Sequence, residues 1–208
     1  MRGERGRSAN SSPQQAEGAP SPERRAFLRQ TAAVGLSLGG SLGLADACAQ
    51  DDPREQRPTA NDRLVIADGP SGERVPLKVD DILVDAKKPL SVFPYDAASG
   101  TVRDGSRLNR LLLVRLAEGA DQGQESKGVV AFSAVCTHEA CSVSEWIPSE
   151  HCLLCPCHFS KFDVRDGGNV IEGPAPRSLP RVPLRVEHDD VLVVDGGFSA
   201  QPGVRRTV

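Results

Sequence analysis

Two short segments hold most of the metal-binding side chains of this 208-residue chain. "CTHEAC" (136–141) and "CLLCPCH" (152–158) together contain five of the six cysteines and two of the four histidines. Thiolates and imidazoles are the ligands that zinc and iron–sulfur centres use. A fold that lets both segments serve one centre must bring two distant loops together, so this feature constrains the chain more than any other.

The ligand pattern reads Cys136-x-His138, then Cys155-x-x-His158 after sixteen residues. Two cysteines and two histidines suit either a zinc ion or an iron–sulfur centre of mixed ligation. Cys141 and Cys157 lie close to these four residues, and a single tetrahedral zinc ion has no use for six ligands. Four ligands and one disulfide would use all six, and a disulfide persists in an exported protein.

Short apolar runs rich in Val, Leu and Ile alternate with clusters of Gly, Pro and Asp after residue 50, as is typical of strands. No stretch of 11–18 residues there has a helical period. Residues 96–107 and 117–128 are expected to be loops, and "HDD" (188–190) a hairpin turn. The pattern predicts a small all-β sandwich or barrel with one cysteine-rich insertion. The strand candidates are 63–67, 75–79, 110–116, 128–135, 169–171, 182–187 and 191–195.

Residues 1–49 look like a disordered N-terminus followed by an export signal. The pair Arg24-Arg25 precedes an uncharged run, 31–45, and resembles a twin-arginine signal. Ala47 and Ala49 have the spacing of a cleavage site, which predicts a periplasmic protein cut after Ala49. If uncut, residues 27–45 would act as a weak membrane anchor, although the uncharged run is shorter than the ~20 residues that span a bilayer.

The rest of the chain divides by composition. A charged segment with two prolines, 50–62, is expected to be a linker, 63–198 the main domain and 199–208 a tail. The whole chain has a net charge of −3, and without residues 1–49 it has 19 basic and 24 acidic side chains, a net charge of −5. Such a surface argues against nucleic acid or an anionic membrane as a partner and leaves other proteins.

"CTHEAC" and "CPCHFS" closely resemble the two boxes of Rieske iron–sulfur proteins, C-T-H-x-G-C and C-P-C-H-x-S, and "GPAP" (173–176) resembles their proline loop. The resemblance covers roughly residues 128–195. It implies a Rieske-type antiparallel β sandwich or barrel, with a small cluster-binding insertion at about 131–176 that holds a 2Fe–2S cluster. The implied site has Cys136 and Cys155 on one iron, His138 and His158 on the other, a disulfide between Cys141 and Cys157, and Gly173, Pro174 and Pro176 covering the cluster.

Three further residues are expected to tune the cluster. Ser160 is placed to donate a hydrogen bond to a cluster sulfur, which raises the reduction potential. Quinol-oxidising relatives typically carry Tyr in place of Phe162 and an apolar residue in place of Glu139. Both departures predict a potential lowered within the range of about −150 to +300 mV, and they favour an aqueous interface over a quinone pocket. Ala140 replaces the usual Gly, a milder change.

"VAFSAVC", "CHFSKFD" and "LPRVPLRV" also resemble the small subunit of arsenite oxidase, a twin-arginine-exported Rieske protein paired with a molybdenum subunit. This likeness implies an electron-transfer subunit with a larger, molybdenum-containing partner and a cytochrome-type acceptor. We expect no catalytic residue in the chain itself, and a free thiol at Cys152.

Two alternatives stay open, the Rieske subunit of a cytochrome bc-type quinol-oxidising complex and a structural zinc module. A Rieske oxygenase is excluded, because only His151 and His188 remain for its mononuclear iron site.

Overall fold

The computed structural model describes residues 52–69, 74–84, 86–117 and 123–205, which all belong to one compact unit, Ala47–Val208. Within these ranges the chain forms strands and three-residue 3-10 turns, and none of its helices has the length and apolar character needed to cross a membrane. The predicted export signal, its cleavage site and the predicted anchor lie outside the described residues.

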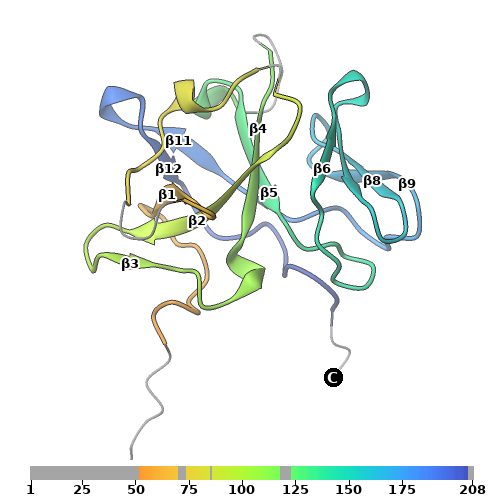
Figure 1. Ribbon diagram of the computed structural model, residues 1–208, viewed down its shortest axis with the longest axis horizontal. Helices are drawn as coiled ribbons and strands as arrows, with labels where there is room; N and C mark the ends of the chain where they lie inside the picture. The colour runs from red at the N-terminus through yellow and green to blue at the C-terminus, as the bar shows by residue number, and fades with distance from the viewer. Residues whose placement is uncertain (1–51, 70–73, 85, 118–122, 206–208) are drawn as a thin grey trace, which may run out of the picture. The chain divides into compact units, whose positions relative to one another are not determined.

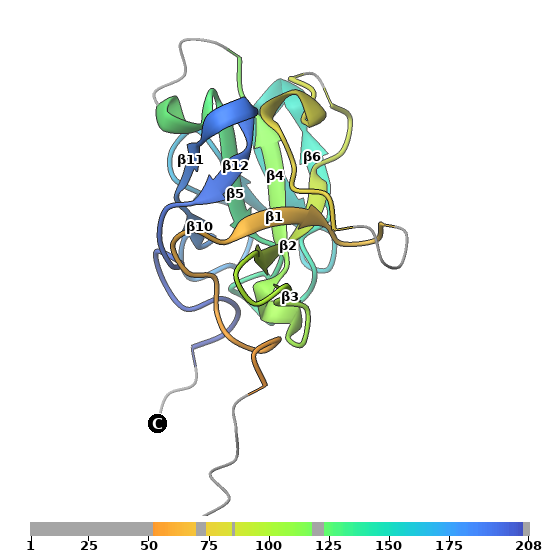
Figure 2. The ribbon, with the colours of Figure 1, turned by 90° about the vertical axis from the view of Figure 1, so that its left-hand side faces the viewer.

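The larger sheet is antiparallel, with strand order β10-β5-β4-β2-β1-β12-β11 and β3 beside β2 (Figure 1). Its two end strands, β10 and β11, are separated in sequence only by Pro183. The ends of the sheet therefore lie next to each other, and the sheet curls into a nearly closed barrel (Figure 2). The all-β prediction is confirmed. Its strands are β1 (Arg63–Ile66), β2 (Leu90–Asp96), β3 (Thr101–Val102), β4 (Leu111–Arg115), β5 (Val129–Ser133), β10 (Arg181–Val182), β11 (Leu184–Val186) and β12 (Leu192–Val194).

A second antiparallel sheet is the predicted cysteine-rich insertion. It consists of β6 (Glu145–Ile147), β7 (Cys152–Cys155), β8 (Ser160–Asp163) and β9 (Asn169–Glu172), paired in that order. Figure 1 shows it beside β4 and β5. The two segments rich in cysteine and histidine lie on this sheet and on the loop that leads into it from β5.

Strands β4 and β5 contribute to two hydrophobic cores, one inside the barrel and one under the second sheet. Leu111 and Leu113 point into the barrel core, whereas Leu112 and Val114 belong to the core under the second sheet, with Phe162. Alternate residues of a strand point to opposite faces, so a strand buried on both faces has a continuous apolar run. This explains "LLLV" at 111–114 and fixes the second sheet against the barrel.

Strand β2 was not expected from the sequence, because Pro94 lies in its middle. The Pro94 carbonyl accepts a hydrogen bond from the Arg103 amide at 2.8 Å, so the proline nitrogen faces the same edge. Pairing with β4 ends at Val92, and pairing with β3 begins at Tyr95. Pro94 therefore occupies the gap between two partners, where a missing N–H removes no ladder bond.

Two other expected strands differ from the observed structure. Residues 75–79 form no strand: Lys78 makes one isolated bridge to Val191, and a 3-10 turn, η2 (Val79–Asp81), follows. The run 182–187 is divided at Pro183, which cannot donate to a ladder, so one part pairs with β5 and the other with β12.

Residues 52–62, expected to be a linker, pack against the barrel. Asp62 is 2% exposed and accepts two hydrogen bonds from the Arg103 guanidinium, at 2.7 and 3.0 Å. The Asn109 side chain donates to the Gln56 carbonyl at 2.8 Å. A buried, paired charge and a satisfied amide hold this segment in place, and composition alone does not indicate either contact.

Candidate metal centre

Two loops carry the candidate ligands. The first, residues 134–142, follows β5 and is folded back on itself, because the Cys136 amide donates to the Cys141 carbonyl at 2.8 Å. The second is the turn between β7 and β8, where Cys155 pairs with Ser160 and four residues connect them. A disulfide between Cys141 and Cys157, with Cα atoms 6.5 Å apart, ties the loops together as predicted.

The two histidines face each other across the loops. His138 Nδ1 and His158 Nδ1 are 3.2 Å apart, and the two rings are perpendicular. Both rings are at least partly exposed, whereas Cys136 and Cys155 are each 1% exposed. Imidazoles thus lie at the surface end of the site and thiols at the buried end.

The donor atoms are separated in a way that tests the kind of metal centre. Among the described residues, possible ligand atoms within 4.8 Å of one another form a sulfur group (Cys141, Cys155, Cys157) and a second group (His138, Glu139, His158). Neither group combines a thiol with an imidazole. The ligand atoms of one tetrahedral zinc ion would lie within about 4 Å of one another. Cys141 and Cys157 are used by the disulfide, so the thiols that remain free near this sulfur group are Cys155 and Cys136, whose side chains interact with each other. Two free thiols and two imidazoles are thus the donors available to a metal centre here.

Cys136 is in an environment that needs a cation. Burial is the largest cause that raises the pKa of this thiol above its ordinary value, and the neighbouring Cys155 raises it further. Hydrogen bonds from the His138 amide, 3.5 Å from Cys136 Sγ, and from the Ser160 side chain oppose that rise. Without a metal the thiol form is therefore favoured, and a bound cation would hold the thiolate.

The proline loop lies directly on Ser160. This serine is fully buried, and its Oγ accepts a hydrogen bond from the Ala175 amide at 3.2 Å. Gly173 has φ +90°, and a Cβ there would be 2.5 Å from Ser160 Cα. Only glycine permits this approach, so Gly173 lets the loop reach the site. Pro174 and Pro176 are exposed beside it.

The two tuning residues occupy different environments. Phe162 is fully buried in the core that the second sheet shares with β4 and β5. Glu139 is exposed, and its carboxylate lies 3.8 Å from His158 Nε2, whereas the Nδ1 atom of the same ring faces His138. A negative charge therefore lies next to the exposed imidazole edge.

Cys152 is a free, fully buried thiol on β7. Burial, followed by the nearby Glu150 carboxylate, raises the pKa of Cys152 to about 11. The thiol is therefore inert at neutral pH.

Three residues beside the site were missed by sequence reasoning. The Thr137 hydroxyl donates to the Arg177 carbonyl at 2.8 Å, the Arg177 guanidinium donates to the Gln201 carbonyl at 2.7 Å, and Arg107 donates to the Ala140 carbonyl. These contacts join segments that are 33 to 40 residues apart or come from the predicted tail. No local pattern in the sequence indicates such contacts.

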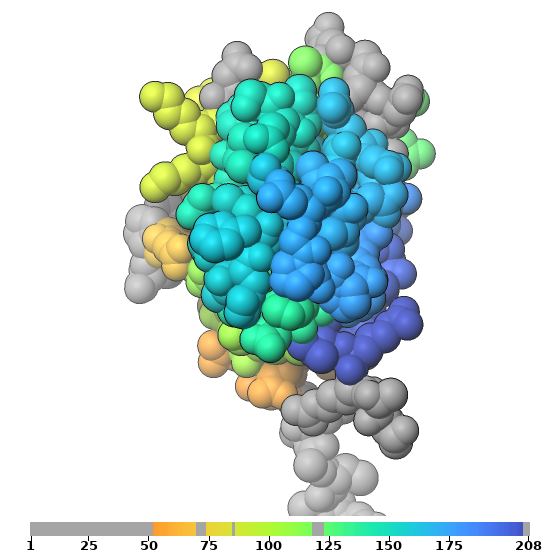
Figure 3. Space-filling model, turned by 90° about the vertical axis from the view of Figure 1, so that its right-hand side faces the viewer, coloured from red at the N-terminus to blue at the C-terminus, as the bar shows by residue number. Residues whose placement is uncertain are grey.

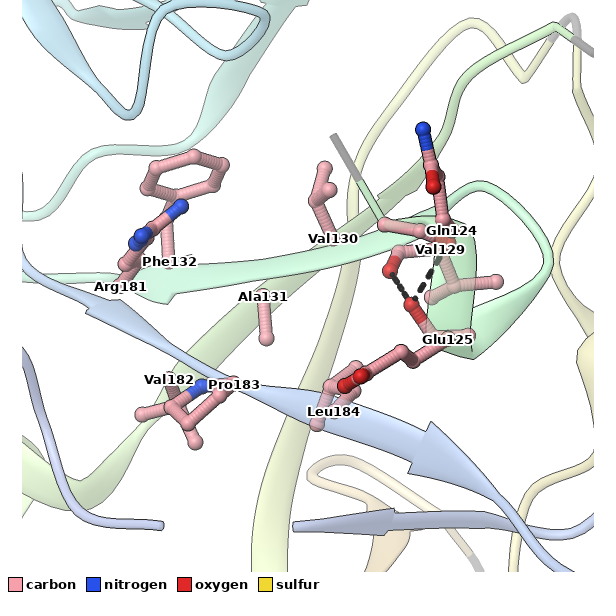
Figure 4. A pocket seen from close by; sticks show the side chains of 12 residues that line it. Gln124, Glu125, Val129, Val130, Ala131, Phe132, Arg181, Val182, Pro183 and Leu184 are labelled. Atoms are coloured by element: carbon pink, nitrogen blue, oxygen red, sulfur yellow. Dashed lines mark hydrogen bonds between the residues drawn. The ribbon is translucent and has the colours of Figure 1, made fainter. Parts of the chain in front are cut away.

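Figure 3 shows the face of the molecule on which the second sheet lies. A separate pocket was found away from the candidate ligands. That pocket has a volume of about 450 Å³ and lies between β5, the β10–β11 segment and the 3-10 turn η4 (Gln124–Ser126) (Figure 4). Phe132 and Arg181 lie side by side at one end of it. Its lining contains no cysteine or histidine, so it is distinct from the metal centre.

Comparisons with known proteins agree on one family. A family model described as the Rieske [2Fe–2S] domain matches residues 95–183. A protein of Haloferax mediterranei, named putative respiratory nitrate reductase subunit Rieske, is 36% identical over 188 residues, which cover 86% of this chain and 80% of that protein.

Two shorter similarities were also found. The cytochrome bc1 complex Rieske iron–sulfur subunit of Streptomyces lividans is 42% identical over 77 residues, 37% of this chain and 45% of that subunit. The chain thus spans less than half the length of this relative. The solved soluble domain of Rieske protein II from Sulfolobus acidocaldarius is 25% identical, with a TM-score of 0.37, over 48% of this chain and 68% of that one.

Proposed function

Because the chain belongs to the Rieske [2Fe–2S] family, we propose that it is the electron-transfer subunit of an exported, periplasmic oxidoreductase. It would pass single electrons between a larger subunit and a soluble, cytochrome-type acceptor. The observation that carries this proposal is Glu139, whose carboxylate is 3.8 Å from the exposed edge of His158.

In this proposal Cys136 and Cys155 bind one iron of the 2Fe–2S cluster, and His138 and His158 bind the other through Nδ1. The burial of both thiols, the exposure of both imidazoles and the 3.2 Å between the two Nδ1 atoms support this assignment. The cluster supplies one-electron chemistry, and two neutral imidazoles in place of two thiolates raise its potential.

The chain's own residues make one end of the site buried and leave the other end open to a partner. The buried cysteines keep water away from one end of the site, while the histidines present their outer nitrogens to a partner. Ser160 is held by the Ala175 amide, so its hydroxyl can donate to Cys136 Sγ. Donation to a ligand sulfur stabilises added negative charge and favours the reduced state.

The charge of the cluster-binding part indicates the kind of partner surface. Residues 131–176 carry six acidic and two basic side chains, a net charge of −4. Complementary charge speeds protein association and fixes its orientation, so we expect a surface rich in Lys and Arg on the partner. Glu139 lies beside the exposed histidine, where a quinone pocket would need an apolar side chain.

A second candidate is the Rieske subunit of a cytochrome bc-type complex. It is supported by the 42% identity to the Streptomyces subunit over 77 residues. Glu139 and Phe162 argue against it, since both departures lower the potential and the carboxylate does not suit a quinone. We therefore keep quinol oxidation as the alternative.

The larger subunit would be a molybdenum-containing enzyme. The resemblance to the arsenite oxidase small subunit supports this, and arsenite is one candidate substrate. The Haloferax relative is named as a subunit of a nitrate reductase, which supports a respiratory partner that acts on a small inorganic oxyanion.

Purification of the tagged full-length chain from its native cells tests the proposal. We expect it in the periplasmic fraction with a mass that begins at Gln50, in a complex that contains molybdenum and lacks haem b. A complex with haem b in the membrane fraction would support the bc-type alternative and contradict the proposal. The reduced-minus-oxidised spectrum measures haem b, and elemental analysis measures molybdenum.

A further inference from the structure

Ala140 has an unusual backbone conformation for its residue type. It lies in the first metal-binding loop with φ +56°, in the left-handed region, where its Cβ is unfavourable. Its amide donates to the Cys136 carbonyl at 3.1 Å, and the disulfide-bonded Cys141 follows it. The loop therefore needs outside contacts that keep Ala140 in this conformation.

Two contacts from distant segments meet at Ala140. Arg107, in the 3-10 turn η3 (Arg107–Asn109), donates through Nη2 to the Ala140 carbonyl. Gly203, which is buried, lies near the same residue: a Cβ added to it would make ordinary van der Waals contacts, 3.7 Å from Ala140 Cβ and 3.4 Å from Val135 Cγ1. The segment around Gly203 therefore lies beside the Ala140 side chain.

Arg177 holds the segment that contains Gly203. Its Nη2 donates to the carbonyls of Gln201, at 2.7 Å, and of Gly203. Pro202 and Gly203 are buried, although residues 199–208 were expected to be a tail. The Arg177 carbonyl accepts the Thr137 hydroxyl at 2.8 Å, so the same residue also contacts the loop directly, between Cys136 and His138.

We propose that Arg177 is a positioning residue for the cluster and that residues 199–203 form a clamp with it on the first loop. The clamp keeps Ala140 in its left-handed conformation and so fixes the loop amides. One of these, the His138 amide, lies 3.5 Å from Cys136 Sγ. This inference rests on the proposed ligand set, in which Cys136 binds an iron. An amide that donates to a ligand sulfur affects the reduction potential, so the clamp affects it by fixing that amide.

The test uses the full-length protein with Arg177→Gln, and Arg205→Gln as a matched control. Arg205 is a neighbouring charge that acts on Arg177. We expect Arg177→Gln to speed hydrogen exchange of the Ala140 amide by roughly tenfold or more. We also expect a midpoint potential lower than that of Arg205→Gln. Ala140→Gly, added to Arg177→Gln, should restore both values, because glycine adopts positive φ without the clamp.

The possible results separate the clamp from other roles. A purely electrostatic role predicts the same potential shift in both arginine variants and no rescue by Ala140→Gly. A merely structural role predicts a lower melting temperature with an unchanged potential. Either result would overturn the proposal. Exchange of the Ala140 amide is measurable without bound metal, so the clamp can be refuted even if the proposed ligand set is wrong. The ligand set is tested separately, by the EPR signal of the unaltered protein.

Discussion

Gly173→Ala tests how closely the proline loop must approach the metal centre. The added Cβ would lie 2.5 Å from Ser160 Cα, 2.8 Å from Ser160 N and 2.9 Å from the Phe159 carbonyl oxygen. These are backbone atoms at the start of β8, so the loop itself must move away. That movement would break the 3.2 Å hydrogen bond from the Ala175 amide to Ser160 Oγ.

Three contributions set the expected loss of stability. A non-glycine residue at φ +90° costs about 1 kcal/mol or more, overpacking costs about 1–3 kcal/mol, and the lost hydrogen bond costs about 0.5–1.5 kcal/mol. We therefore expect a loss of roughly 3–5 kcal/mol in the free energy of unfolding. The midpoint potential should fall as well, because Ser160 no longer has a fixed orientation toward Cys136.

Gly167→Ala is the matched control. Gly167 also has a positive φ, +62°, but a Cβ there meets nothing within 4 Å. It should cost only the conformational strain, about 1–2 kcal/mol, and leave the potential unchanged. The assay is guanidinium unfolding followed by the fluorescence of Trp146, the only tryptophan, together with a redox titration. Equal losses in the two variants, with equal potentials, would refute the reasoning.

Three further predictions follow from the site. His158→Ala should abolish the reduced-state EPR signal, whereas Cys141→Ser should leave a signal with a shorter half-life; an unchanged half-life would show that the disulfide has no role. Glu139→Leu should raise the midpoint potential by roughly 10–40 mV, because a screened negative charge is removed from beside His158. Phe162→Tyr should also raise the potential, because tyrosine adds a hydrogen-bond donor. A lower midpoint potential in the redox titration of either variant contradicts this. The pKa of Cys152 is raised from 9.0 to about 11, so its contribution to stability is fully present below pH 9 and is lost as pH rises through 11, roughly 3 kcal/mol in all. Cys152→Ala should remove that loss in unfolding curves.

The family and its cluster type could be predicted because their signal is local, two short motifs of cysteine and histidine. The resemblance also implied the disulfide between Cys141 and Cys157, which the structure contains. The resemblance also indicated Gly173, for which the structure supplies the reason, a close approach to Ser160.

The remaining features depend on contacts that sequence patterns do not carry. Strand β2 was not among the expected strands, and the tolerance of its Pro94 depends on where two neighbouring strands end. Asp62 was read as part of a charged linker, because its partner Arg103 is 41 residues away. Arg177 belongs to no motif, and its role depends on a tail that folds back under the first loop. In each case a distant segment decides what the local residues do.

An EPR-monitored redox titration of the full-length protein tests the central claim most directly. The account predicts a reduced-state signal that titrates as one electron, with a midpoint in the middle or lower part of the range of about −150 to +300 mV. A signal near the top of that range would contradict the relay role and support quinol oxidation. Absence of a signal with the native metal bound would contradict the cluster itself.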